Sequence, residues 1–162
     1  MPATYEPIAT TTLGTAAATI SFTSISSAYT DIRYVASIKA TASSSIRVQL
    51  NGDTGTNYSS TFLWGDGASA SSFRNTNSNY LTGSYSVSTT PLLWTFDFFN
   101  YAGSTNKTAL QTHSNDNNGS GEVARVVGLW RNTAAINRID LLCAGSTFAA
   151  GTTVTLYGIL KA

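Results

Sequence analysis

Charged residues are scarce in this chain of 162 residues, and their scarcity excludes two classes of partner. Only 10% of the residues are charged, and the formal net charge is +1 at pH 7. Binding to nucleic acid or to an anionic membrane surface relies on a concentrated positive field. We therefore expect no nucleic acid and no membrane among the partners.

The chain has one cysteine and one histidine, which limits its covalent and metal chemistry. Cys143 lies in the apolar run "IDLLCAG" without an activating neighbour, so a buried thiol is expected. His113 lies in "THSNDNNGSGE", which is typical of an exposed polar loop. A single histidine and a distant cysteine make a poor zinc ligand set, and no G-x-S-x-G motif indicates a serine hydrolase. We predict no metal and no cofactor.

Acidic residues are few and scattered, so the sequence does not support glycosidase chemistry. A glycosidase needs two carboxyl groups that face each other across a cleft, and sequence alone does not show that any two of these acids meet. Asp97 and Asp140 interrupt apolar strands, where each is expected to point outward or to pair with Arg125, Arg131 or Arg138. We predict no enzyme and no catalytic residue.

Long apolar runs are also missing. No segment approaches the roughly 20 apolar residues of a membrane-spanning helix. The start, "MPATYEPIATTT", lacks the basic region and apolar core of a signal peptide. Synthesis in a cytoplasm is therefore expected.

The sequence does contain a strong period of two. In "DIRYVASIKA" the apolar residues alternate with polar ones, as in a half-buried antiparallel strand. Residues 46–50 and 92–101 show the same pattern. Further strands are predicted at residues 18–25, 57–64, 108–113, 122–131, 136–143 and 152–160, which makes nine. Residues 69–80 are interpreted as a loop that could hold one helical turn.

Short strands that end in Gly, Asn, Asp or Ser predict an all-β fold. Because no strand–helix–strand rhythm is present, we expect a jelly-roll-like antiparallel β-sandwich. Residues 1–12 are predicted to be an extended arm, and residues 13–162 a single sandwich domain. Pro2 and Pro7 favour the extended arm, in which Tyr5 and Ile8 are candidates for burial against a partner.

The loop "NGDTGTNYS" at residues 51–59 is a candidate calcium site or a turn. An EF-hand loop that begins at Asn51 would need an acid at its twelfth position, which is Phe62. We predict a turn in which Gly52 and Gly55 take backbone angles closed to other residues. An irregular calcium site at Asp53 is the alternative.

Aromatic residues gather in the part of the chain that is richest in Gly, Ser and Asn. They are Tyr58, Phe62, Trp64, Phe73, Tyr80 and Tyr85. Such residues fill a core, anchor a subunit interface or stack on sugar rings. Core or interface is the favoured interpretation. The candidates for a platform that binds glycan are Tyr58, Trp64, Tyr80 and Tyr85.

Four segments together resemble small β-rich virion proteins of tailed bacteriophages, especially aquatic phages and cyanophages. They are "AYTDIRYVASI", "RVQLNGDTGTNYSS", "WGDGASASS" and "FAAGTTVTLYGI". The resemblance implies a virion component with a jelly-roll-like fold, often trimeric, that serves as a capsid decoration (cement) protein or as a tail-associated module. It implies no active site.

Two functions follow as expectations from this resemblance. The first is capsid decoration by a homotrimer bound to the major capsid protein or other virion proteins, favoured because the chain lacks a stalk. The second is a tail-fibre or receptor-binding head that recognises host surface polysaccharide. Both place the protein in the virion.

Overall fold

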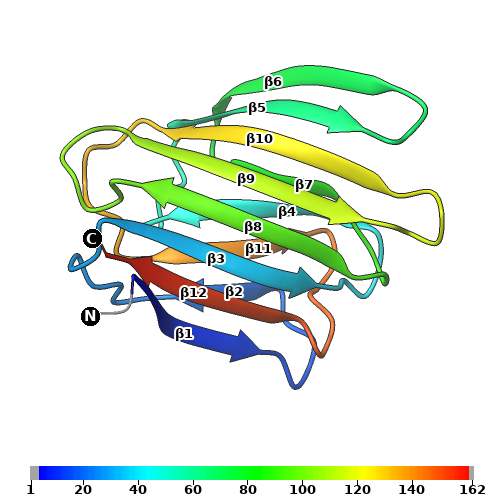
Figure 1. The fold of residues 1–162 in the computed structure, drawn as a ribbon, viewed down its shortest axis with the longest axis horizontal. Helices are drawn as coiled ribbons and strands as arrows, with labels where there is room; N and C mark the ends of the chain where they lie inside the picture. Colours follow the sequence, from blue (N-terminus) through cyan, green and yellow to red (C-terminus); the bar gives the residue numbers. More distant parts are fainter. Residues whose placement is uncertain (1–3, 161–162) are drawn as a thin grey trace.

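The computed structural model describes residues 4–160, and all regular structure in this range is β-strand (Figure 1). The strands are β1 (Tyr5–Thr12), β2 (Thr19–Phe22), β3 (Asp31–Ile38), β4 (Ser44–Leu50), β5 (Tyr58–Gly65), β6 (Ala70–Ser78), β7 (Leu81–Val87), β8 (Leu92–Phe99), β9 (Lys107–Asn115), β10 (Glu122–Trp130), β11 (Ile139–Ala144) and β12 (Thr153–Ile159). Within that same range no helix is long and apolar enough to cross a membrane.

The strands form two antiparallel sheets of unequal width. The larger sheet has eight strands in the order β1-β12-β3-β8-β9-β10-β5-β6, and the smaller has four in the order β2-β11-β4-β7. Their facing sides enclose one core of apolar side chains. The predicted all-β, jelly-roll-like antiparallel sandwich is confirmed.

The alternation in the sequence correctly identifies the buried faces. Ile32, Tyr34, Ala36 and Ile38 of β3 are all buried, as are the matching positions of β4. On β8, the aromatic residues at positions 94, 96 and 98 are fully buried. The ring of Tyr34 packs edge-on against Trp94 and Phe96 at centroid distances of 4.9 and 5.0 Å. These aromatic contacts fill the centre of the core.

Three strands were not predicted as strands, namely β1, β6 and β7. The helical turn allowed for residues 69–80 is wrong, because residues 70–78 form β6. Its cross-strand pair Phe62–Phe73 stacks at a centroid distance of 4.4 Å, and Asn77 takes a positive φ of 53° at the end of the strand. Pairing with β5 overrides the weak local preference of a Ser- and Asn-rich segment.

Residues 5–12, expected as an arm, are extended and form the edge strand β1 of the larger sheet. They pair with β12 of the same chain, with an irregular register between Pro7 and Ala9. A proline is tolerated in an edge strand, since one side of that strand has no ladder partner. Ile8 packs against the core of its own sandwich, while Tyr5 is exposed and lies edge-on to Tyr157. Residues 1–3 lie outside the described range.

The smaller sheet covers only part of the larger one. Its edge strand β7 lies against β10 and β5, so β6 extends past it. Most residues of β6 are exposed, in contrast to the buried alternation of β3 or β8. β5 and β6 lie at one end of the larger sheet, opposite β1 (Figure 1). The sandwich is therefore open along the side of β7.

Candidate functional site

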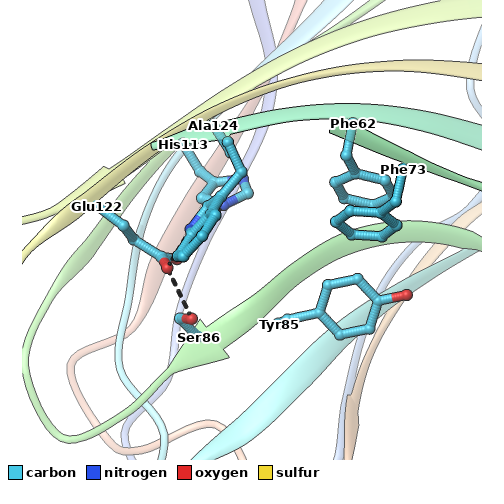
Figure 2. Close-up of a pocket in the computed structure, with 8 residues that line it drawn as sticks. Phe62, Phe73, Tyr85, Ser86, His113, Glu122 and Ala124 are labelled. Carbon is cyan, nitrogen blue, oxygen red and sulfur yellow. Dashed lines mark hydrogen bonds and ion pairs between the residues drawn. The ribbon is translucent and has the colours of Figure 1, made fainter. Parts of the chain in front are cut away.

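A pocket of about 250 Å³ lies at this open side, between β7 and the inner face of the larger sheet. Its lining residues come from both sheets and are brought together from distant parts of the chain (Figure 2). They are Phe62 and Trp64 of β5, Phe73 of β6, Tyr85 and Ser86 of β7, His113 of β9, and Glu122 and Ala124 of β10. The pocket combines an apolar surface with one carboxylate.

The strand register explains how the middle of the pocket is built. Ala124 on β10 pairs with Trp64 on one side and with His113 on the other, so the three side chains lie in a row across the sheet. Side chains in such a row stand next to one another on one face. Because Ala124 carries only a methyl group, space remains between the indole and the imidazole.

An aromatic wall forms one side of the pocket. The rings of Phe62 and Phe73 are parallel to within 5°, and Tyr85 lies 5.5 and 5.8 Å from them (Figure 2). Phe62 is buried, whereas Phe73 and Tyr85 are 40% and 47% exposed. Exposed aromatic rings beside an apolar cavity offer a stacking surface to a ligand.

The carboxylate of Glu122 forms the polar side of the pocket. Its Oε2 accepts hydrogen bonds from Trp64 Nε1 at 2.7 Å and from Ser86 Oγ at 2.9 Å. Its Oε1 lies 3.7 Å from His113 Nε2 and accepts no hydrogen bond from any residue of the described range. Two donors thus hold the carboxylate in place, and one oxygen is left to accept a hydrogen bond from a ligand.

His113 is buried next to this carboxylate, so the exposed loop expected for it is wrong. It is an inward-facing residue of β9, and its side chain is only 3% exposed. Burial lowers the pKa of its imidazole, and the charge of Glu122 opposes this only in part. Its Nδ1 has no hydrogen-bond partner among the described residues. The imidazole is therefore neutral at neutral pH.

A second cavity of about 230 Å³ adjoins the first and shares Tyr85, Ser86 and Glu122 with it. Its remaining lining residues are polar, namely Ser43, Ser88, Asn115, Asn117 and Ser120. Asn117 Nδ2 donates to Ser120 Oγ at 3.1 Å, so part of this lining is already ordered. We call the two cavities together the Glu122 groove, with an apolar part and a polar part.

Of the four residues predicted to bind glycan, Trp64 and Tyr85 line the groove and the other two do not. Tyr58 is fully buried, and its hydroxyl donates to the Asp53 carbonyl at 2.9 Å, so it belongs to the core. Tyr80 packs under Arg47, with the guanidinium carbon 4.4 Å from the ring centroid. Tyr58 is therefore corrected to a core residue.

Tyr5 and Ile8, the predicted partner contacts, lie on β1 at the opposite edge of the larger sheet from β6. The sequence interpretation did not select His113, Ser86 or Glu122 as site residues. The sequence did hold one signal for Glu122, because Glu122 lies two residues before Ala124 and four before Val126, and alternate residues of β10 face inward. The missing information was the position of β7 against that face.

The loop at residues 51–59 is a turn, as predicted. Asn51 and Gly52 take positive φ angles of 53° and 69°, and Asp53 N donates to Leu50 O at 2.9 Å, so the two residues form a tight turn that leads from β4 of the smaller sheet towards β5 of the larger. The expectation for Gly55 is wrong, since its φ is not positive. A Cβ at this position would lie 2.9 Å from Asn57 Nδ2, so a larger residue would displace that side-chain amide.

Asp53 uses its carboxylate within this turn. It accepts hydrogen bonds from Gly55 N, Asn57 Nδ2 and Trp130 Nε1. Burial acts to raise its pKa, but these donors outweigh it and leave the pKa below the usual value. No cluster of three or more potential metal ligands exists within residues 4–160.

The other titratable residues singled out by sequence have structural roles. Asp140 pairs with Arg138 at 2.8 Å, as expected, whereas Asp97 pairs with Arg33 rather than with Arg125, Arg131 or Arg138. Cys143 is buried as predicted, and burial raises the pKa of its thiol.

Comparisons with known proteins add a limited result. No family model and no curated protein matches the chain. Among solved structures, galectin LEC-6 from Caenorhabditis elegans has a TM-score of 0.41 and 9% identity, and the alignment covers 94% of this chain and 96% of the galectin. Exo-inulinase from Aspergillus awamori has a TM-score of 0.44 and 14% identity, and the alignment covers 96% of this chain but only 29% of the inulinase. Similarities this distant concern the fold alone.

Proposed function

We propose that the chain is a structural protein of a tailed-bacteriophage virion and that it decorates the capsid. In this role it binds, as a homotrimer, to the major capsid protein or to other virion proteins, and it catalyses no reaction. The resemblance of four sequence segments to phage virion proteins supports the virion assignment. The outer face of the larger sheet supports the binding role.

That outer face is the observation on which the proposal rests. Six large apolar side chains point outward from it and are 44–60% exposed, namely Val35, Leu63, Leu93, Phe99, Val123 and Val127. Contiguous exposed apolar patches on soluble proteins mark contacts with other proteins.

The strand register places several of these residues close together. Leu63 pairs with Arg125, so it lies diagonally next to both Val123 and Val127. Val123 and Leu93 both pair with Ser114 from opposite sides. Apart from Arg125, the residues that pair at this point are uncharged, so binding through this face would bury apolar area and would resist moderate salt.

Copy number and surface variants test the proposal. Quantitative mass spectrometry of purified virions should find the protein at a copy number comparable with that of the major capsid protein. A Leu93→Ser/Val123→Ser variant should fold normally and bind much less well to virions that lack the protein. Leu142→Ser, on the outer face of β11, is the matched control and should bind normally.

A few copies per virion, located at the tail, would refute capsid decoration. Undiminished binding of the double variant would show that another surface makes the contact.

A specific observation favours a second function, a receptor-binding head that recognises host surface polysaccharide. The Glu122 groove joins exposed aromatic rings to a carboxylate and to serine and asparagine side chains, a combination suited to sugar rings. Trp64 is partly exposed and lines this groove rather than the core. Binding to a glycan array that is lost on Trp64→Ala, with folding intact, tests this function.

A further inference from the structure

We propose that the Glu122 groove binds an uncharged oligosaccharide of at least two rings and that Glu122 excludes acidic sugars. This inference rests on the second function above and adds the site, the number of rings and the charge selectivity. Two observations support it, namely the change from an apolar to a polar lining along the groove and the charges of the residues that line it.

The apolar part suits one sugar ring. Tyr85 and Phe73 present exposed ring surface on which the C–H face of a pyranose can pack. A hydroxyl of the same ring can then donate to Oε1 of Glu122, the oxygen that accepts no hydrogen bond from the described chain. A hydrogen bond to a charged acceptor is stronger than one between neutral groups. Glu122 therefore fixes the orientation of this ring.

The polar part suits the next ring of the same ligand. It shares Ser86 and Glu122 with the apolar part, and its serine and asparagine side chains supply both donors and acceptors. Several are already ordered, since Asn117 Oδ1 accepts from Thr90 Oγ1 at 3.2 Å and Asn115 Nδ2 donates to Ser86 O at 3.4 Å. A ligand that extends from the aromatic wall into this part meets hydroxyl and amide groups. Two linked rings match this change of surface.

The charges along the groove set its selectivity. Within residues 4–160, Glu122 and His113 are the titratable acid–base residues that line it, apart from the phenol of Tyr85, and burial lowers the pKa of His113 and so favours its neutral form. Arg125 lies on the opposite face of β10, since residues alternate along a strand. A sugar carboxylate would therefore lie beside Glu122 without a cation to pair with it. Two like charges a few ångströms apart in a partly buried site repel strongly.

Isothermal titration calorimetry at neutral pH can test the inference with matched ligands. The probes are neutral hexose and N-acetylhexosamine disaccharides, their monosaccharides, and disaccharides with a uronic acid in place of the neutral ring. The neutral disaccharides should bind more tightly than their monosaccharides. The uronic acid counterparts should bind at least about tenfold more weakly, since a factor of ten requires only about 1.4 kcal/mol of repulsion.

Four variants locate the site. Glu122→Gln keeps an oxygen that accepts from Trp64 and Ser86 but removes the charge, so it should narrow the gap between neutral and acidic ligands. Ala124→Phe should fill the apolar part and abolish binding. Tyr85→Ala, at an exposed position, should weaken binding about tenfold and covers the case in which Ala124→Phe misfolds. Tyr80→Ala, outside the groove, is the control and should bind normally.

The possible failures are distinguishable. If no saccharide binds, both saccharide recognition and this inference are overturned. If neutral sugars bind but Tyr85→Ala and Glu122→Gln change nothing, saccharide recognition holds and the groove is the wrong site. If the uronic acid ligands bind as tightly as the neutral ones, the selectivity is refuted.

Discussion

The buried amide of Gln111 connects the two sheets, and its replacement offers a quantitative test of how the sandwich is held together. Its Oε1 accepts from Trp94 Nε1 on β8 at 2.9 Å, and its Nε2 donates to the Thr82 carbonyl on β7 at 2.6 Å. All three side chains are at most 1% exposed. Gln111→Leu keeps a similar volume but leaves the indole N–H and the carbonyl without this partner.

The expected loss follows from these two groups. A buried donor or acceptor left unsatisfied costs about 1–3 kcal/mol, so the pair costs about 2–6 kcal/mol. Burial of leucine in place of an amide returns about 1 kcal/mol. The free energy of unfolding should therefore fall by about 1–5 kcal/mol, a large part of the roughly 5–15 kcal/mol that typical domains have.

Urea denaturation followed by far-UV circular dichroism measures this change. Gln49→Leu is the matched control, because Gln49 donates to the Asn79 carbonyl at a partly exposed position and should change stability by no more than about 0.5 kcal/mol. Trp94→Phe removes the orphaned donor, so Gln111→Leu should cost less in that background than in the wild type. The reasoning is refuted if Gln111→Leu costs no more than Gln49→Leu, or if the two core substitutions are strictly additive.

Three further predictions concern pH, calcium and thiol chemistry. Burial lowers the pKa of His113 below its ordinary value of 6.5, so the unfolded chain binds a proton before the folded chain does as the pH falls, and the stability should be full above about pH 6.5 and decline below it. In urea titrations at several pH values, His113→Gln should show a smaller decline in stability than the wild type, and an equal decline would contradict this prediction. Asp53→Ala should lower the free energy of unfolding by about 1–3 kcal/mol, because Trp130 Nε1 loses its hydrogen-bond acceptor. Added calcium should leave the urea midpoint of the wild type unchanged, and a midpoint that rises with calcium would support a calcium site at Asp53. The thiol of Cys143 should react with Ellman's reagent far more slowly in the folded protein than in urea, since it is buried and its pKa is raised; equal rates would show that it is accessible.

Local patterns in the sequence determined the fold class and the buried faces of the long strands. The alternation at Ile32, Tyr34 and Ile38 specifies which face of β3 is buried, because successive side chains of a strand point to opposite sides. The Asn51-Gly52 pair specifies a tight turn after β4, because both residues tolerate a positive φ. Each of these features depends on neighbours in the chain.

Two strands that the sequence did not reveal, β1 and β6, each form by pairing with a single neighbouring strand. Residues 5–12 become β1 by pairing with β12, and residues 70–78 become β6 by pairing with β5. Neither segment has a clear apolar alternation of its own, since each lies at an edge of the sheet and buries little. Edge strands therefore leave a weak signal in the sequence.

The candidate site also contains some residues that the sequence indicated and others that only the tertiary structure brought together. The sequence marked Trp64 and Tyr85 as aromatic residues in a polar region, and that alone does not separate a groove from a core, as the burial of Tyr58 demonstrates. Only the tertiary structure placed Ser86 and Glu122 together, 36 residues apart in the chain and 2.9 Å apart in space. The physical reason is that the smaller sheet ends at β7, which lies against β10 and β5, while the larger sheet continues to β6. The width of two stacked sheets is set by long-range pairing, which no local pattern encodes.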